Sequence, residues 1–162
     1  MADLREQLEA TLRGRVCFIG VGNVDGGDDG FGVRLAEAIA RAGVPDVILA
    51  GTAPERVISQ CANGGFDHLV FLDAVGFDAK PGSATFLNSK EMNARLPQVS
   101  THRISLGVLA NFVESGRQTR AWLLGVEPES LKPSPNLSPT VAVTLAIVAE
   151  LIAGVIGAEI KT

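Results

Sequence analysis

Short apolar runs alternate along the chain with longer amphipathic stretches, a pattern typical of alternating strands and helices. The runs are β-branched or aromatic, end at turn residues and predict five strands, at 16–20, 46–50, 68–74, 83–88 and 120–126. Helices are predicted at 30–43, 54–65 and 101–116, with a short amphipathic helix near the N-terminus and an apolar one beginning near Ser138.

Strands that bracket helices of this length indicate βαβ units, and hence a parallel sheet with helices on both faces. The stretch "VGFDAKPG" after the third strand is too short for a crossover helix, so strand 83–88 must turn back and lie antiparallel at an edge. The predicted fold class is α/β, a three-layer α/β/α sandwich with a five-stranded, mostly parallel sheet. No repeat or linker divides the sequence, and residues 1–162 are predicted to form a single domain.

Charge and cysteine content change this picture little. A net charge of -4 without a basic patch argues against a nucleic-acid partner. Cys17 and Cys61 form neither a CxxC pair nor a disulfide framework, which indicates buried thiols and, with no export signal, a cytoplasmic location. Residues 140–158 are nearly apolar, but Glu150 lies near their middle, so a buried helix packed on the sheet is predicted rather than a membrane span.

The segment "GVGNVDGGDDGFGVR", residues 20–34, separates the first strand from the next helix. A glycine-rich turn at this place seats the pyrophosphate in dinucleotide-binding folds. The G-x-G-x-x-G spacing fails here at Asp25, and the carboxylates of Asp28 and Asp29 would repel a phosphate. A nucleotide-binding Rossmann-like module is therefore kept only as an alternative.

A metal site is the other interpretation of the loop. The carboxyl ends of the first and third strands flank the crevice where the winding of such a sheet reverses. Asp29 follows the first strand, Asp73 lies near the end of the third, and His102 opens a predicted helix from which it can point across the crevice. Two carboxylates and an imidazole suit nickel, zinc or iron. From spacing alone, structural roles are equally compatible: a helix cap for Asp28 or Asp29, a turn for Asp73 and a surface position for His102.

Five sequence blocks follow one another along the chain. They are "GVGNVDGGDDGFGVRLAEA" from residue 20, "GTAPE" at 51–55, "LVFLDAV" at 69–75, "STHRISLGVL" at 100–109 and "LLGVEPESLKPSPNLSPTV" at 123–141. Together they make the chain resemble the maturation endopeptidases of nickel-iron hydrogenases, small α/β proteases that trim a C-terminal extension from the large-subunit precursor. The second and fourth blocks are most similar to the branch that serves formate-linked hydrogenases.

The resemblance implies that Asp29, Asp73 and His102 are both the catalytic and the metal-contacting residues. It implies that nickel arrives inside the hydrogenase large-subunit precursor, so the substrate supplies the metal and another divalent ion in a crystal would be a stand-in. No nucleic-acid or membrane partner is expected, and the oligomeric state stays open. The predicted substrate-binding residues come from the first two blocks: Gly22, Asn23, Gly51 and Thr52.

The sequence departs from the family pattern at two places. Leu49 and Ala50 stand where many relatives carry an acidic residue followed by glycine, a position linked to substrate choice. Asp29 stands where relatives often carry Glu. The expected chemistry is peptide hydrolysis of the aspartic or metal-assisted type, with nickel as Lewis acid and a carboxylate as general base. A non-catalytic nickel-binding docking protein is the second alternative.

Overall fold

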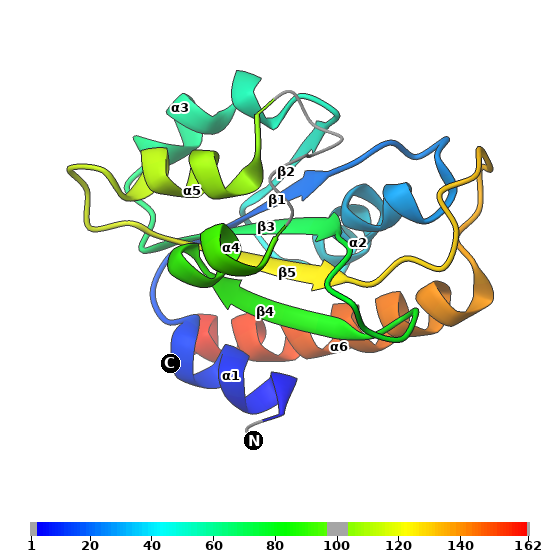
Figure 1. Ribbon diagram of the computed structural model, residues 1–162. Helices are drawn as coiled ribbons and strands as arrows, with labels where there is room; N and C mark the ends of the chain where they lie inside the picture. Colours follow the sequence, from blue (N-terminus) through cyan, green and yellow to red (C-terminus); the bar gives the residue numbers. More distant parts are fainter. Residues whose placement is uncertain (1–2, 97–103, 162) are drawn as a thin grey trace.

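The computed structural model describes residues 3–96 and 104–161, and five of its strands form one mixed sheet. The strands are β1 (Val16–Val21), β2 (Val47–Gly51), β3 (His68–Ala74), β4 (Ala84–Asn88) and β5 (Arg120–Val126), in the spatial order β2-β1-β3-β5-β4 (Figure 1). β1 pairs in parallel with β2 and β3, and β3 pairs in parallel with β5. β4 runs antiparallel to β5 at the edge, as predicted.

Helices cover both faces of this sheet (Figure 1). One hydrophobic cluster joins the sheet to α1 (Leu4–Thr11), α2 (Phe31–Arg41) and α6 (Pro139–Lys161). A second cluster joins it to α3 (Ile58–Ala62), α4 (Ser89–Arg95) and α5 (Leu106–Glu114). Every residue of β1 is buried, because a central parallel strand packs on helices from both sides. The predicted three-layer sandwich is confirmed.

Two helices differ from the prediction in extent, and a third was not predicted. The predicted helix 54–65 is divided into the 3-10 turn η2 (Pro54–Arg56) and the short α3. α5 begins only at Leu106, because Ser105 is its N-cap and its side chain accepts from the Val108 N–H. α4 was not predicted, although Asn88 and Glu91 form a capping box at its N-terminus.

α6 is buried on one face only, which corrects the expectation of a buried helix. Val141 and Ile152 are fully buried in the first cluster. On the opposite side Val143 is 61% exposed and Ile147 is 55% exposed. Among the described residues, Pro139–Ala158 is one segment with the length and apolar composition to cross a membrane. Those two properties are shared by helices that pack on the core of a globular domain, as α6 does on α2 and α1.

The two cysteines meet in the second cluster. Cys17 on β1 and Cys61 on α3 are free and buried. A side-chain hydrogen bond with Cys61, together with burial, raises the pKa of the Cys17 thiol above its ordinary value. The predicted buried thiols are therefore confirmed.

Candidate functional site

Three segments meet around Gly22, directly after β1. Its φ of 131° lies in a region that favours glycine, and a Cβ at this position would lie 1.9 Å from the backbone oxygen of Asp29. The same Cβ would lie 3.6 Å from Oδ1 of Asp73, near the end of β3. The Gly22 N–H donates to the oxygen of Gly51, at the end of β2, over 2.8 Å. The ends of β1, β2 and β3 thus converge at the place the topology predicts.

Asp29 is half-buried on the 3-10 turn η1 (Gly27–Gly30), between β1 and α2. Its Oδ2 accepts a hydrogen bond of 3.0 Å from the N–H of Asn23. The Asn23 side chain is used within the same loop, since its Oδ1 accepts from the Asp25 N–H over 2.9 Å. The loop therefore orients the Asp29 carboxylate through its backbone, while the carboxylate keeps contact with solvent.

Asp73 approaches the same place from the sheet. It has no exposed surface, and its Oδ1 accepts from the N–H of the following residue, Ala74, over 2.9 Å. β3 is central in the sheet, and Asp73 pairs with Gly125 of β5, one residue beyond Leu72, where the ladder with β1 ends. The position of Asp73 is therefore fixed by the sheet. Asp29 and Asp73 are thus brought to the same end of the sheet from separate parts of the chain.

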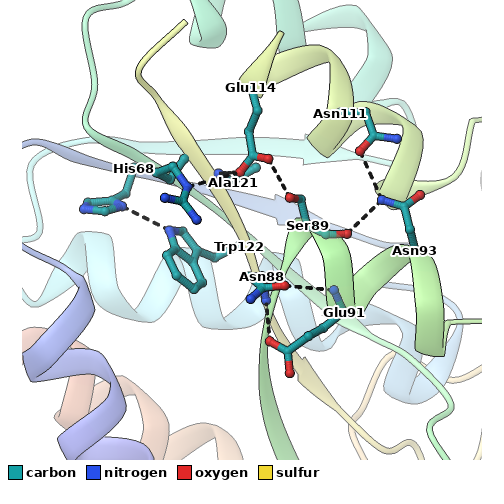
Figure 2. A network of polar contacts seen from close by, with 10 residues as sticks. His68, Asn88, Ser89, Glu91, Asn93, Asn111, Glu114, Ala121 and Trp122 are labelled. Carbon is teal, nitrogen blue, oxygen red and sulfur yellow. Dashed lines mark hydrogen bonds and ion pairs between the residues drawn. The ribbon is translucent and has the colours of Figure 1, made fainter.

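His102, the third predicted ligand, lies outside the described residues, between α4 and α5. The two helices are tied to each other by a polar network (Figure 2). Asn93 donates to Oδ1 of Asn111 over 3.1 Å, and the hydroxyl of Ser89 donates to Oε1 of Glu114 over 2.5 Å. Within residues 3–96 and 104–161, no three His, Cys, Asp or Glu side chains are grouped as a metal site.

Asp28 has a structural role that the sequence did not reveal. It is fully buried, and its Oδ2 accepts from the N–H groups of Glu129 and Ser130 at 2.9 and 3.0 Å and from the Ser138 hydroxyl at 2.9 Å. Its Oδ1 accepts from the Ser138 N–H over 2.7 Å. It does not cap α2, whose N-cap, Gly30, makes no side-chain hydrogen bond. Burial raises the pKa of Asp28, but the hydrogen bonds from Ser130, Ser138 and Glu129 outweigh burial and leave this pKa below its ordinary value.

Gly22, Asn23, Gly51 and Thr52, the predicted substrate-binding residues, come from segments that end beside the two aspartates. Thr52 and Asn23 are exposed, and a Cβ on Gly51 would meet nothing within 4 Å. Their contact with a substrate stays a prediction.

His68 begins β3, at the end of the strand opposite to Asp73. The indole Nε1 of Trp122 donates to Nδ1 of His68 over 3.0 Å (Figure 2). Burial lowers the pKa of His68 below its ordinary value. His68 thus lies at the other end of the strand from Asp73, which makes it a poor candidate for a ligand of the same metal ion.

Comparison with known proteins points to one family. A family model described as hydrogenase maturation protease matches residues 32–155. The hydrogenase 2 maturation protease of Escherichia coli K12 is 35% identical over 135 residues, which cover 78% of this chain and 81% of that protein.

Two solved structures agree with this match. The [NiFe] hydrogenase maturation protease HycI of Thermococcus kodakarensis KOD1 superposes with a TM-score of 0.81 at 29% identity, covering 93% of this chain and 99% of the other. The maturating endopeptidase HybD of E. coli gives a TM-score of 0.73 at 30% identity, covering 86% and 90%. Family model, sequence relative and fold agree over most of the chain, which therefore belongs to the hydrogenase maturation proteases, a family of peptidases.

Proposed function

We propose that this peptidase removes the C-terminal extension from the precursor of a nickel-iron hydrogenase large subunit after nickel has been inserted. Asp29, Asp73 and His102 contact the nickel that the precursor brings, and the protein holds no metal of its own in this scheme. The observation that carries the proposal is the proximity of both residues to Gly22, since the backbone oxygen of Asp29 and the carboxylate Oδ1 of Asp73 both lie within 4 Å of the Cβ position of Gly22.

The donor set fits a nickel ion supplied by the substrate. Two carboxylates and one imidazole are a mixed oxygen and nitrogen set, which leaves coordination positions for the ligands that the precursor provides. In the precursor, nickel supplies Lewis acidity that polarises the scissile carbonyl or a water molecule. Asp29 is half-buried and held by the Asn23 N–H, so it is the carboxylate placed to accept a proton from an attacking water.

The burial of Asp73 means that docking of the precursor requires a local movement. Asp73 has no exposed surface in this conformation, so contact with a nickel ion from another protein requires the surrounding atoms to move aside. Its position on the central strand β3 is rigid, whereas Asp29 lies on a loop. We therefore assign Asp73 the role of the fixed ligand and Asp29 that of the adjustable one.

Replacing Asp29 with Asn tests the assignment. The amide keeps an oxygen for the hydrogen bond from Asn23 but removes the negative charge and the basic site. Incubation with the nickel-loaded precursor, followed by mass spectrometry of its C-terminus, is expected to show an intact tail with D29N. The matched control is D25N, which removes an exposed charge from the same loop and is expected to cleave normally. Cleavage by D29N at the normal rate would overturn the proposal.

Two other functions predict different results. A dinucleotide-binding module predicts that NAD or FAD raises the melting temperature, because a ligand that binds only the folded state stabilises it. A non-catalytic docking protein predicts tight nickel uptake with no shortening of the precursor. Tail removal by the wild-type chain only when the precursor holds nickel would exclude both.

A cytoplasmic location and a soluble precursor partner belong to the same proposal. The free, buried Cys17 and Cys61 support a reducing compartment. Detection of the chain in the soluble cell fraction tests this point, and recovery with membranes would contradict it.

A further inference from the structure

β2 is an edge strand that lacks the usual protection. Among the described residues, no strand pairs with its outer side (Figure 1). Its sequence, "VILAG", contains no charge and no proline, which are the common devices that keep sheet edges from pairing with other chains. Leu49, at its centre, is 54% exposed.

The parallel ladder determines which backbone groups face outward. The Phe18 N–H donates to the oxygen of Asp46 over 2.9 Å. In a parallel ladder the backbone groups of every second residue point to the same neighbouring strand, so those of Asp46 and Ile48 point toward β1. Val47 and Leu49 alternate with them. Their N–H and C=O groups therefore point away from the sheet, where an extended chain can bind them.

This edge leads directly to the candidate site. β2 ends at Gly51, whose oxygen accepts from the Gly22 N–H, and Gly22 lies against Asp29 and Asp73. Neighbouring strands are about 4.8 Å apart, so a strand added beside β2 would lie roughly 14 Å from β3. About four extended residues span that distance. A peptide bound at the edge can therefore reach both aspartates.

We propose that the outer edge of β2 binds an extended segment of the precursor as an added β-strand, about four residues from the bond that is cut. The inference rests on the proposed function, because a protease of this kind must hold the flexible end of its substrate in an extended form beside the site. Val47 and Leu49 supply the backbone donors and acceptors, so recognition there depends little on the substrate's side chains.

Leu49→Pro tests the edge, since proline removes the outward N–H without removing a bond to β1. Loss of one such hydrogen bond is expected to raise the KM for the nickel-loaded precursor about tenfold and to leave kcat within about twofold. The matched control is Ala84→Pro on β4, the opposite edge. The Glu127 N–H donates to the oxygen of Ser83, which places the Ala84 N–H on the outer side of that strand too. This variant is expected to keep the wild-type KM.

Amide exchange tests the same contact without mutation of the edge. With D29N, which is expected not to cut, the nickel-loaded precursor is added at a concentration that saturates binding, and it is expected to slow exchange of the Val47 and Leu49 amides about tenfold or more. If the precursor does not slow exchange, or if a folded L49P has an unchanged KM, the edge proposal is overturned. Cleavage by the wild type would then still support the proposed function. Absence of wild-type cleavage would refute the function, and the exchange result would still decide whether the edge binds the precursor. A free chain that is a dimer with these amides already protected would assign the edge to a second copy and also overturn the proposal.

Discussion

Replacing Asp28 with Asn tests whether this carboxylate clamps the glycine loop to the segment after β5. Asp28 accepts four hydrogen bonds, three at Oδ2 and one at Oδ1. An amide has a single oxygen, so its NH2 group must face at least one donor, the backbone N–H of Ser138. A buried donor without a partner costs about 1–3 kcal/mol, and the remaining bonds lose the assistance of the charge. The lower desolvation cost of a neutral amide offsets part of this loss. We expect D28N to lower the free energy of unfolding by about 2–4 kcal/mol.

Urea unfolding at pH 7, followed by far-UV circular dichroism, measures this difference. The matched control is D25N, which makes the same charge change in the same loop. Asp25 is exposed, and its hydrogen bonds with Asn23 and Ser134 use its backbone N–H and C=O. Its replacement is expected to change the stability by less than about 0.5 kcal/mol. A D28N variant as stable as D25N would refute the clamp.

The pH dependence gives an independent check. The pKa of Asp28 is lower in the folded chain than its ordinary value of 3.8. The stability from its charge is therefore fully present above that ordinary value and is lost as the pH falls through the folded-state pKa. The difference in the free energy of unfolding between wild type and D28N is therefore expected to become smaller below about pH 4. A constant difference down to pH 3 would show that the carboxylate is not an ionised acceptor.

Two further predictions follow from the geometry. Gly22→Ala places a Cβ 1.9 Å from the backbone oxygen of Asp29 at a φ of 131°, so it is expected to lower the free energy of unfolding by more than about 2 kcal/mol and to stop cleavage. The Cβ of Gly51→Ala meets no neighbour, so this control is expected to cost about 1 kcal/mol, measured by thermal unfolding. Equal losses would contradict this reasoning. His68 is expected to titrate below its ordinary pKa of 6.5 in an NMR experiment, so the stability from its neutral form is present above pH 6.5 and is lost on acidification. A titration midpoint above 6.5 would contradict the effect of burial.

The sheet was predictable because its strands carry their own signals. β3 is a continuous apolar run flanked by turn residues, and the short link before β4 left room only for an antiparallel return. Helix extents were less predictable, since they depend on single capping residues. The capping box of Asn88 and Glu91 was a legible signal for α4, whereas the division of 54–65 into η2 and α3 has no such marker. The exposed face of α6 was not predictable from hydropathy, because both of its faces are apolar.

The candidate site was predictable in part. The rule that the carboxyl ends of parallel strands lie at the same edge of a sheet is enough to predict that Asp29 and Asp73 lie close together. The role of Asp28 depends on Glu129, Ser130 and Ser138, about a hundred positions away in the sequence, and nothing local marks that contact. The neighbouring aspartates therefore looked equivalent in the sequence, and only the folded chain separates them.

The geometry of η1 explains how adjacent aspartates have different surroundings. A 3-10 turn has about three residues per turn, so successive side chains point roughly 120° apart. On this turn, Asp28 points into the protein and binds the segment after β5, while Asp29 stays half-buried beside Gly22. One short turn thus carries both an anchor, Asp28, and a candidate ligand, Asp29. The two roles should separate in experiment: D28N is expected to act mainly on the free energy of unfolding, and D29N mainly on precursor cleavage. If both variants lost cleavage with unchanged stability, the aspartates would share one function and this division would be wrong.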